Sequence, residues 1–310
     1  MKKLIYLFLF TCCSVLVLNG QGVGASPEYI KAITPEWKGE RFPDGRPKIP
    51  DNLLERAKKI AIEAMWGPLR NLRYTNQFEG SFRVVHPDQT MTGRAVTAQY
   101  MPARPDFEGY KKEQGRLEGR SQQGGTNSWP INVLVEGDIY VADSYGKIVD
   151  GTLIGDNLAN AIYAKSKRGV VFYGSIRDEE GIKRVEGFNA WVLGADPSYI
   201  MDMMLSTINH PVRIGRATVL PGDLVVAKQY GVLFIPAHLA ERVIVEGEMT
   251  ELRDAFGWQR LREGKYLPGQ IDSKWSDEIN ADFREWLKKY PDLPMPLAEV
   301  EAFLNGQRTW

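Results

Sequence analysis

The sequence predicts an α/β fold for most of the chain. Between residues 131 and 236, short segments rich in valine and isoleucine alternate with one clear helical segment, residues 157–167, and with turns marked by glycine. Residues 224–227 and 232–235 are two apolar segments joined by a short polar connection, which predicts a β-hairpin. After Pro236 the pattern becomes that of amphipathic helices. We therefore expect a strand-rich core followed by C-terminal helices.

Residues 1–21 have the order of regions found in a secretory signal peptide. Lys2 and Lys3 form a basic start, residues 4–18 are apolar, and residues 19–21 are small or polar. The apolar run is short for a transmembrane helix. We therefore expect an exported, periplasmic protein with no stable membrane insertion after cleavage.

Both cysteines, Cys12 and Cys13, lie inside this predicted signal peptide. Cleavage near Gly20 would leave a mature chain without disulfides or thiolate chemistry. Residues 9–12 are a weak match to a lipoprotein signal, so lipid anchoring is the less favoured alternative.

The charge balance excludes some function classes. The chain has 39 basic and 39 acidic residues, and removal of Lys2 and Lys3 leaves 37 against 39, a net charge of −2. Without a basic excess we do not expect nucleic-acid binding. The three histidines at positions 86, 210 and 238 are scattered, so a zinc site is not expected.

Elements before the core are predicted from local signals. Residues 22–50 are rich in proline, glycine and charge and are expected to form an extended arm on the surface. Asp51 is a candidate N-cap of a helix that Trp66-Gly67-Pro68 would end. Residues 83–100 alternate enough to supply strands, whereas residues 101–130 predict a long irregular loop, mobile or shaping the site entrance.

The C-terminal region predicts three helices, over residues 237–262, from Ser276 to about residue 290, and over residues 296–305. Four aromatic side chains in the last part are expected to pack onto the core or a neighbouring subunit rather than to bind a ligand: Trp275, Phe283, Trp286 and Phe303.

The most informative charged motif is Asp156, followed after twenty residues by Arg177-Asp178. Asp156 opens a turn that feeds a helix, and the Arg-Asp pair closes a buried strand. A strand–loop–helix arrangement can bring the three together, where a carboxylate holds a hard cation and a guanidinium grips a substrate carboxylate. The alternatives are a surface ion pair for Arg177-Asp178 and an N-cap for Asp156.

From about residue 91 to residue 245 the chain resembles the RraA-like family. That family includes the regulator of ribonuclease E activity and the class II pyruvate aldolases that cleave 4-hydroxy-4-methyl-2-oxoglutarate and 4-carboxy-4-hydroxy-2-oxoadipate. The matching segments, in family order, are TGRAVT (92–97), EGDIYVAD (136–143), GDNLA (155–159), GSIRD (174–178), PV (211–212), VLPGDLVVA (219–227) and GVLFIP (231–236).

The resemblance implies a swivelling β/β/α core over residues 51–250, with residues 22–50 and 251–310 added to it. It also implies a homotrimer or homohexamer with the site between subunits. Asp178 would be the metal ligand, for Mg²⁺ or Mn²⁺. Arg177 would contact the pyruvyl oxygens and stabilise an enolate, and Asp156 would orient a water at the metal or transfer a proton.

The resemblance also suggests how the substrate is held. Gly155, Asp156, Asn157 and Leu158 open a helix whose N-terminal N–H groups suit a substrate carboxylate, opposite Arg177. The expected function is that of a class II, metal-dependent carbon–carbon lyase acting on a 2-oxo acid. The reaction would be retro-aldol cleavage releasing pyruvate or oxaloacetate-type decarboxylation.

Two alternatives stay open: a non-catalytic RraA-like binding or regulatory protein, and a lyase or hydratase for an exported sugar acid. The chain departs from the family pattern at residues 64–69, where an Asp-Ala-Leu turn is usual, and at Lys228 and Tyr230 in the hairpin. These departures leave the substrate open.

Overall fold

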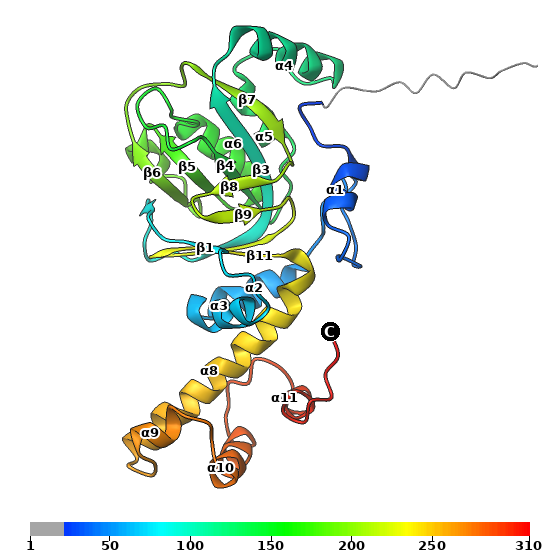
Figure 1. Cartoon of the computed structure of the whole chain (residues 1–310). Coiled ribbons are helices and arrows are strands. Elements are labelled where there is room, and N and C mark those ends of the chain that lie inside the picture. Colours follow the sequence, from blue (N-terminus) through cyan, green and yellow to red (C-terminus); the bar gives the residue numbers. More distant parts are fainter. Residues whose placement is uncertain (1–21) are drawn as a thin grey trace, which may run out of the picture.

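The computed structural model describes residues 22–310, so the predicted signal peptide lies outside the described residues. A mixed sheet forms the centre, with the strand order β1-β11-β10-β3-β4-β5-β6-β2 and with β7 paired to β3 (Figure 1). Its strands are β1 (Phe78–Glu79), β2 (Arg83–Val84), β3 (Met91–Pro102), β4 (Asp138–Asp143), β5 (Val170–Ile176), β6 (Ala190–Ala195), β7 (Met203–Ile208), β10 (Leu224–Lys228) and β11 (Gly231–Ile235).

Strands β3, β4, β5 and β6 are parallel neighbours, and the pairs around them are antiparallel. The predicted hairpin is confirmed, with Leu224 opposite Ile235 and Lys228 opposite Gly231. The fold is a mixed α/β architecture with helices added at the C-terminal end, as the sequence predicted.

Alternate residues of the parallel strands face two different hydrophobic layers. Phe172 of β5 packs in the layer that includes Ile162 of α6 (Asp156–Ser166), which confirms the predicted central helix. Val171 packs on the other face with β8 (Val212–Ile214) and β9 (Ala217–Val219), a separate two-stranded sheet. Strands buried on both faces explain the nearly continuous apolar segments of the sequence.

The N-terminal region is more helical than expected. The arm contains α1 (Pro27–Ile33), capped by Ser26. Asp51 is the first residue of α2 (Asp51–Lys59) rather than its cap. The backbone is not helical at Ala61, and α3 (Ile62–Asn71) follows.

The predicted helix end at Trp66-Gly67-Pro68 is wrong, because α3 continues through Pro68 to Asn71. Met65 and Leu69 are fully buried in the layer that also contains α2, β10 and β11. Burial of these two side chains stabilises the helix across the proline.

Residues 101–130 are not an irregular loop. Strand β3 extends to Pro102, and α4 (Pro105–Leu117), η1 (Thr126–Ser128) and α5 (Trp129–Asn132) follow. Gly115 of α4 lies so close to the Trp129 ring that a Cβ would overlap it. Glu118 accepts the backbone N–H of Gly24 (3.1 Å), so this segment holds the start of the described chain.

The C-terminal helices are present as predicted. After η2 (Ala237–Leu239) come α8 (Ala240–Arg262), α9 (Pro268–Ile271), α10 (Asp277–Leu287) and α11 (Leu297–Leu304). Ser276 caps α10 by accepting the N–H of Ile279 (3.4 Å). Figure 1 shows α8 running away from the sheet and carrying the last helices with it.

The aromatic residues of this extension form a core of their own around Phe256 of α8. The Phe256 ring centroid lies 5.2 Å from that of Trp275, 5.3 Å from Phe283 and 5.7 Å from Trp286. They pack on the distal half of α8 and not on the sheet. Within residues 22–310 no helix is both long and apolar enough to cross a membrane.

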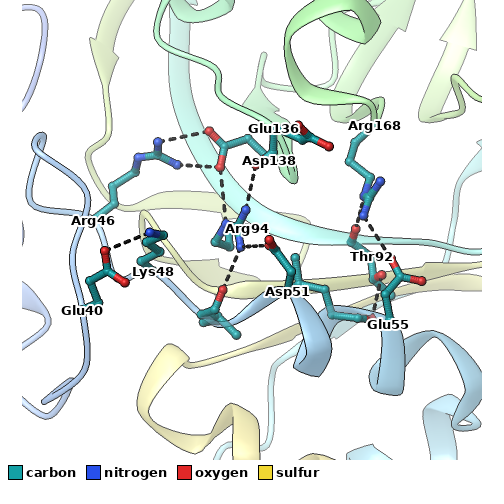
Figure 2. A network of polar contacts seen from close by, with 12 residues as sticks. Glu40, Arg46, Lys48, Asp51, Glu55, Thr92, Arg94, Glu136, Asp138 and Arg168 are labelled. Atoms are coloured by element: carbon teal, nitrogen blue, oxygen red, sulfur yellow. Dashed lines mark hydrogen bonds and ion pairs between the residues drawn. The ribbon is translucent and has the colours of Figure 1, made fainter.

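A buried polar network fastens the arm to the sheet (Figure 2). Arg46 is 1% exposed and binds both carboxylate oxygens of Asp138 in β4, at 3.0 and 3.1 Å. Arg94 of β3 donates to the Asp51 carboxylate and to the Ile49 carbonyl, both at 2.7 Å. The network therefore joins the arm, α2, β3 and β4.

Arg46→Ala should destabilise the protein strongly, because it leaves the Asp138 carboxylate buried without its bidentate partner. Breaking a buried ion pair typically costs about 3–5 kcal/mol. Urea denaturation followed by circular dichroism measures the free energy of unfolding. The control is Lys48→Ala, which removes an exposed pair with Glu40 and should change stability by about 1 kcal/mol or less. Equal effects of the two substitutions would contradict this role for Arg46.

Candidate functional site

The predicted charged motif is assembled where β5 meets the start of α6. Arg177 and Asp178 follow the last residue of β5, and α7 (Glu179–Ile182) begins directly after them. The backbone N–H of Arg177 donates to the carbonyl of Ile154 (3.0 Å), which draws the loop before α6 against the end of β5. The structure therefore brings Asp156, Arg177 and Asp178 to one place.

Asp178 has a left-handed backbone, with φ 55° and ψ 39°. Aspartate adopts this conformation more readily than most residues, because its short side chain can hydrogen-bond locally. The turn separates β5 from α7 and leaves the Asp178 side chain 40% exposed.

Two glycines permit the close approach of these side chains. A Cβ on Gly155 would overlap Oδ2 of Asp178 and lie 3.3 Å from Nε of Arg177. A Cβ on Gly181 in α7 would lie 2.6 Å from Oδ2 of Asp156. The site therefore depends on small residues on both sides of it.

The three residues line a groove of about 740 Å³. Its lining residues are mostly charged and come from β2, α6, α7 and the ends of β5 and β6: Arg83, Asp156, Arg177, Asp178, Glu179, Glu180, Gly181, Lys183, Arg184, Ala195, Asp196 and Pro197. Four of them are cationic and five carry carboxylates, a formal balance of −1.

The Arg177 guanidinium is largely available to a ligand. Its side chain is 43% exposed, and its ion pair with Asp178 is long, with Nε 3.6 Å from Oδ2. Within the described part of the chain, no other side-chain partner of Arg177 is found. A guanidinium in this state can offer its paired N–H groups to a carboxylate.

Glu179, by contrast, is engaged by two cations. Its carboxylate pairs with Arg83 at 2.6 Å and with Lys183 at 2.8 Å. Burial acts to raise the pKa of Glu179, but the hydrogen bonds and charges of Lys183 and Arg83 outweigh it and lower this pKa. The charges of Arg83 and Lys183 are thus partly neutralised by Glu179, which leaves these two side chains less available to a ligand than Arg177.

The start of α6 differs from the expectation in two respects. Gly155 is the N-cap, and Asp156 is the first helical residue. Oδ1 of Asp156 accepts the N–H of Asn157 (2.8 Å), so this N–H is not free for a substrate. Gly155, Asn157 and Leu158 are not among the groove-lining residues, whereas Asp156 is.

The donors in the groove fit a hard divalent cation. They are carboxylate oxygens, and no histidine or cysteine lines the groove. Within residues 22–310, no group of three or more histidine, cysteine, aspartate or glutamate side chains is arranged to hold a metal ion. Mg²⁺ commonly uses one or two protein carboxylates and keeps several waters, so the carboxylates of Asp156 and Asp178 match the ligand type that this ion takes.

Several groove residues were missed in the sequence. Residues 179–184 directly follow the Arg-Asp motif, and their charge density was a usable signal. Arg83 comes from a strand almost a hundred residues earlier, and only the pairing of β2 with β6 brings it here.

The segment expected to shape the site entrance, and the hairpin residues that depart from the family pattern, lie away from the groove. No residue of 105–130 lines the groove, although Asn127 supports the loop before α6 by donating to the Leu153 carbonyl (2.7 Å). Lys228 and Tyr230 lie beside α2 and α3, where Tyr230 donates to Glu63 (2.6 Å) and Lys228 to the Lys58 carbonyl (3.2 Å).

Comparison with known proteins identifies the family. Residues 50–234, more than half of the chain, match the family model described as RraA-like, Aldolase/RraA. The chain belongs to the RraA-like family.

Two curated relatives are similar to part of the chain. The 4-hydroxy-4-methyl-2-oxoglutarate aldolase of Thermus thermophilus is 29% identical over 32% of this chain, and the match spans 60% of that protein. A putative aldolase of the same name from Ectopseudomonas mendocina is 30% identical over 36% of this chain and 67% of its own length.

Solved structures show the same fold. Streptomyces coelicolor RraAS2, described as an unusual member of the RNase ES inhibitor RraA protein family, superposes with a TM-score of 0.59 and 24% identity. The match covers 69% of this RraA-like chain and all of that one. An uncharacterized Pseudomonas syringae protein gives a TM-score of 0.57 at 19% identity, over 73% of this chain and 98% of its own.

Gly155→Ala should disturb the site while the core stays folded. The added methyl group overlaps the Asp178 carboxylate. If Asp178 holds a cation, Mn²⁺ affinity measured by electron paramagnetic resonance should fall at least about tenfold, equivalent to ~1.4 kcal/mol. Gly109→Ala is the control, because a Cβ on this α4 residue meets no atom within 4 Å. Unchanged Mn²⁺ affinity in Gly155→Ala would show that Asp178 does not need this close approach.

Proposed function

We propose that this RraA-like protein is a divalent-metal-dependent lyase acting on a 2-oxo acid. It cleaves by a retro-aldol reaction that releases pyruvate, or by oxaloacetate-type decarboxylation. The observation that carries the proposal is the juxtaposition of Asp156 with Arg177-Asp178 in one groove, with the guanidinium largely available. Relatives named as aldolases support the reaction class.

Arg177 binds the 2-oxo acid and stabilises the charge that develops during bond cleavage. Its planar guanidinium can donate two N–H groups to the carboxylate and the neighbouring keto oxygen. When the carbon–carbon bond breaks, its electron pair passes into the pyruvyl fragment and negative charge grows on this oxygen. An Arg177 N–H group already directed at that oxygen lowers the activation free energy of the cleavage.

Asp156 is the proposed proton carrier. Oδ1 is held by the N–H of Asn157, while Oδ2 is available to accept the proton of the substrate hydroxyl in the retro-aldol direction. The same proton can return to the enolate carbon to give pyruvate. Decarboxylation has no hydroxyl to deprotonate, so there the enolate carbon takes its proton from water, and Asp156 can only relay that proton.

The charge of the groove supports a role for a bound cation. With four cationic side chains against five carboxylates, the groove has a formal charge of −1, which repels an anionic substrate. A divalent ion held by Asp178 would reverse this to +1 and supply electrophilic stabilisation to the substrate oxygens.

Substitutions at the three residues should separate their roles. Asp178→Ala should abolish metal-dependent pyruvate release, and Arg177→Lys should lose about 3 kcal/mol of transition-state stabilisation, on the order of a hundredfold in rate. Asp156→Asn should be intermediate, because the amide oxygen still accepts the Asn157 N–H but cannot take a proton. Activity is measured as pyruvate release from a panel of 2-oxo acids with Mg²⁺ and with a chelator.

Matched controls separate loss of function from loss of structure. Asp202→Ala removes another exposed aspartate with positive φ (53°), and Arg213→Lys changes an exposed arginine; neither residue lines the groove. Both should keep activity and melting temperature. An active Asp178→Ala protein, or pyruvate release that a chelator does not affect, would refute the metal-dependent lyase.

We also propose that the protein is exported and that residues 1–21 are removed. The support is the basic–apolar–polar order of that segment. Intact-mass analysis of protein from the periplasmic fraction should give an N-terminus near Gln21. A cytoplasmic protein that retains residues 1–18 would contradict export.

The proposed assembly is a homotrimer or homohexamer with the groove between subunits. Light scattering of the purified protein measures its mass, and a monomer at all concentrations would exclude it.

A further inference from the structure

A second cavity lies between the arm and the sheet, and it shares no lining residue with the groove. Its volume is about 400 Å³, within the usual range of small-molecule sites of about 300–1,000 Å³. Glu36 and Trp37 of the arm form one side. The other sides come from the loop after α3, the turn before β10 and the start of η2.

Three rings line this cavity: Trp37, Tyr74 and His238. The Tyr74 and His238 rings meet edge to face, with centroids 6.2 Å apart and an angle of 62°. The Trp37 indole N–H donates to the Glu40 carbonyl (2.8 Å), so the group it has left to offer is its ring surface. Burial lowers the pKa of His238, although the charge of Glu36 opposes this shift.

Three polar side chains of the cavity offer acceptor oxygens, while the Tyr74 hydroxyl lies 3.4 Å from Nε2 of His238. Glu36 is an exposed carboxylate. Asp223 is a buried carboxyl group, whose pKa burial raises to about 7, and it accepts the N–H of Leu220 (2.8 Å). Gln77 uses its amide nitrogen to donate to the carbonyls of Thr218 (3.2 Å) and Phe234 (3.0 Å), which leaves its oxygen as an acceptor.

No lysine or arginine lines the cavity. Lys38 is near in sequence, but its ammonium group donates to the Pro35 carbonyl (2.7 Å) and the residue is outside the lining. The lining therefore contains two carboxyl groups, three aromatic rings and an amide oxygen but no cation. Arg41 lies outside the lining, where its guanidinium is used by the Thr34 hydroxyl (2.8 Å) and by the carbonyls of Thr34 (2.8 Å) and Trp37 (3.2 Å).

We propose that this cavity binds a small organic cation, an amine with an aromatic or alkyl body. The body packs against the apolar wall, and the ammonium group lies against ring faces and near the Glu36 carboxylate. Cations are attracted to the negative faces of aromatic rings, most strongly to tryptophan. The ligand has the opposite charge to a 2-oxo acid, so this site does not depend on the function proposed for the groove.

Isothermal titration calorimetry of the full mature chain tests the charge preference with three probes of similar shape. 2-Phenylethylammonium should bind, 2-phenylethanol should bind at least about tenfold more weakly, and 3-phenylpropionate should give no binding heat. Equal affinity for the amine and the alcohol, or no binding of the amine, would overturn the proposal.

Variants place the binding in this cavity. Glu36→Gln should weaken amine binding about fivefold and leave alcohol binding unchanged, because an exposed charge interacts modestly. Trp37→Leu should remove most amine binding. Trp258→Leu is the control, since Trp258 is 58% exposed on α8 and outside the cavity, and it should bind the amine normally. Normal amine binding in both Glu36→Gln and Trp37→Leu would place the ligand elsewhere and refute this site.

Discussion

Parallel pairing of β3, β4, β5 and β6 is the constraint on which the rest of the structure depends. Parallel strands have their carboxyl ends at one edge of the sheet, and ligand sites of α/β proteins form at such edges. The loop before α6 runs beside the end of β5, where Thr152 bridges to Ser175 and Arg177 bonds to Ile154. This pairing makes neighbours of a carboxylate and an Arg-Asp pair that are separated by twenty residues.

The added segments are built around this sheet without entering the groove. The arm is held by Arg46, whose guanidinium is neutralised by Asp138 at the start of β4. Helix α4 packs against β7, and Glu118 directly after it accepts the N–H groups of Val23 and Gly24. The C-terminal helices bury their aromatic residues against α8. The groove thus lies on the family core, and the cavity proposed for an amine is created by the arm.

The groove and the second cavity differ in the charged groups that line them. The groove combines four cations with five carboxylates, so one divalent ion changes the sign of its formal charge. The second cavity has carboxyl groups and aromatic rings but no cation in its lining. The buried position of Asp223 raises its pKa to about 7, although two backbone N–H groups act against this shift.

The sequence by itself determined the strand-rich core, the hairpin, the central helix and the three C-terminal helices, because hydrophobic periodicity and capping residues are local signals. It also determined the clustering of Asp156, Arg177 and Asp178, since a strand end and a helix start in one α/β unit meet at the same edge. It did not predict α4 or the continuation of α3 through Pro68, because these helices depend on packing against distant residues.

Only the tertiary structure decided what surrounds the motif. The pairing of β2 with β6 brings Arg83 to Glu179, and the Asn157 N–H is taken by Asp156 rather than left for a substrate. The second cavity likewise needs the arm, the loop after α3, the turn before β10 and the start of η2 together. Contacts between residues far apart in the chain follow no periodic pattern in the sequence. The charged groups and rings of such residues therefore come together only when the chain folds.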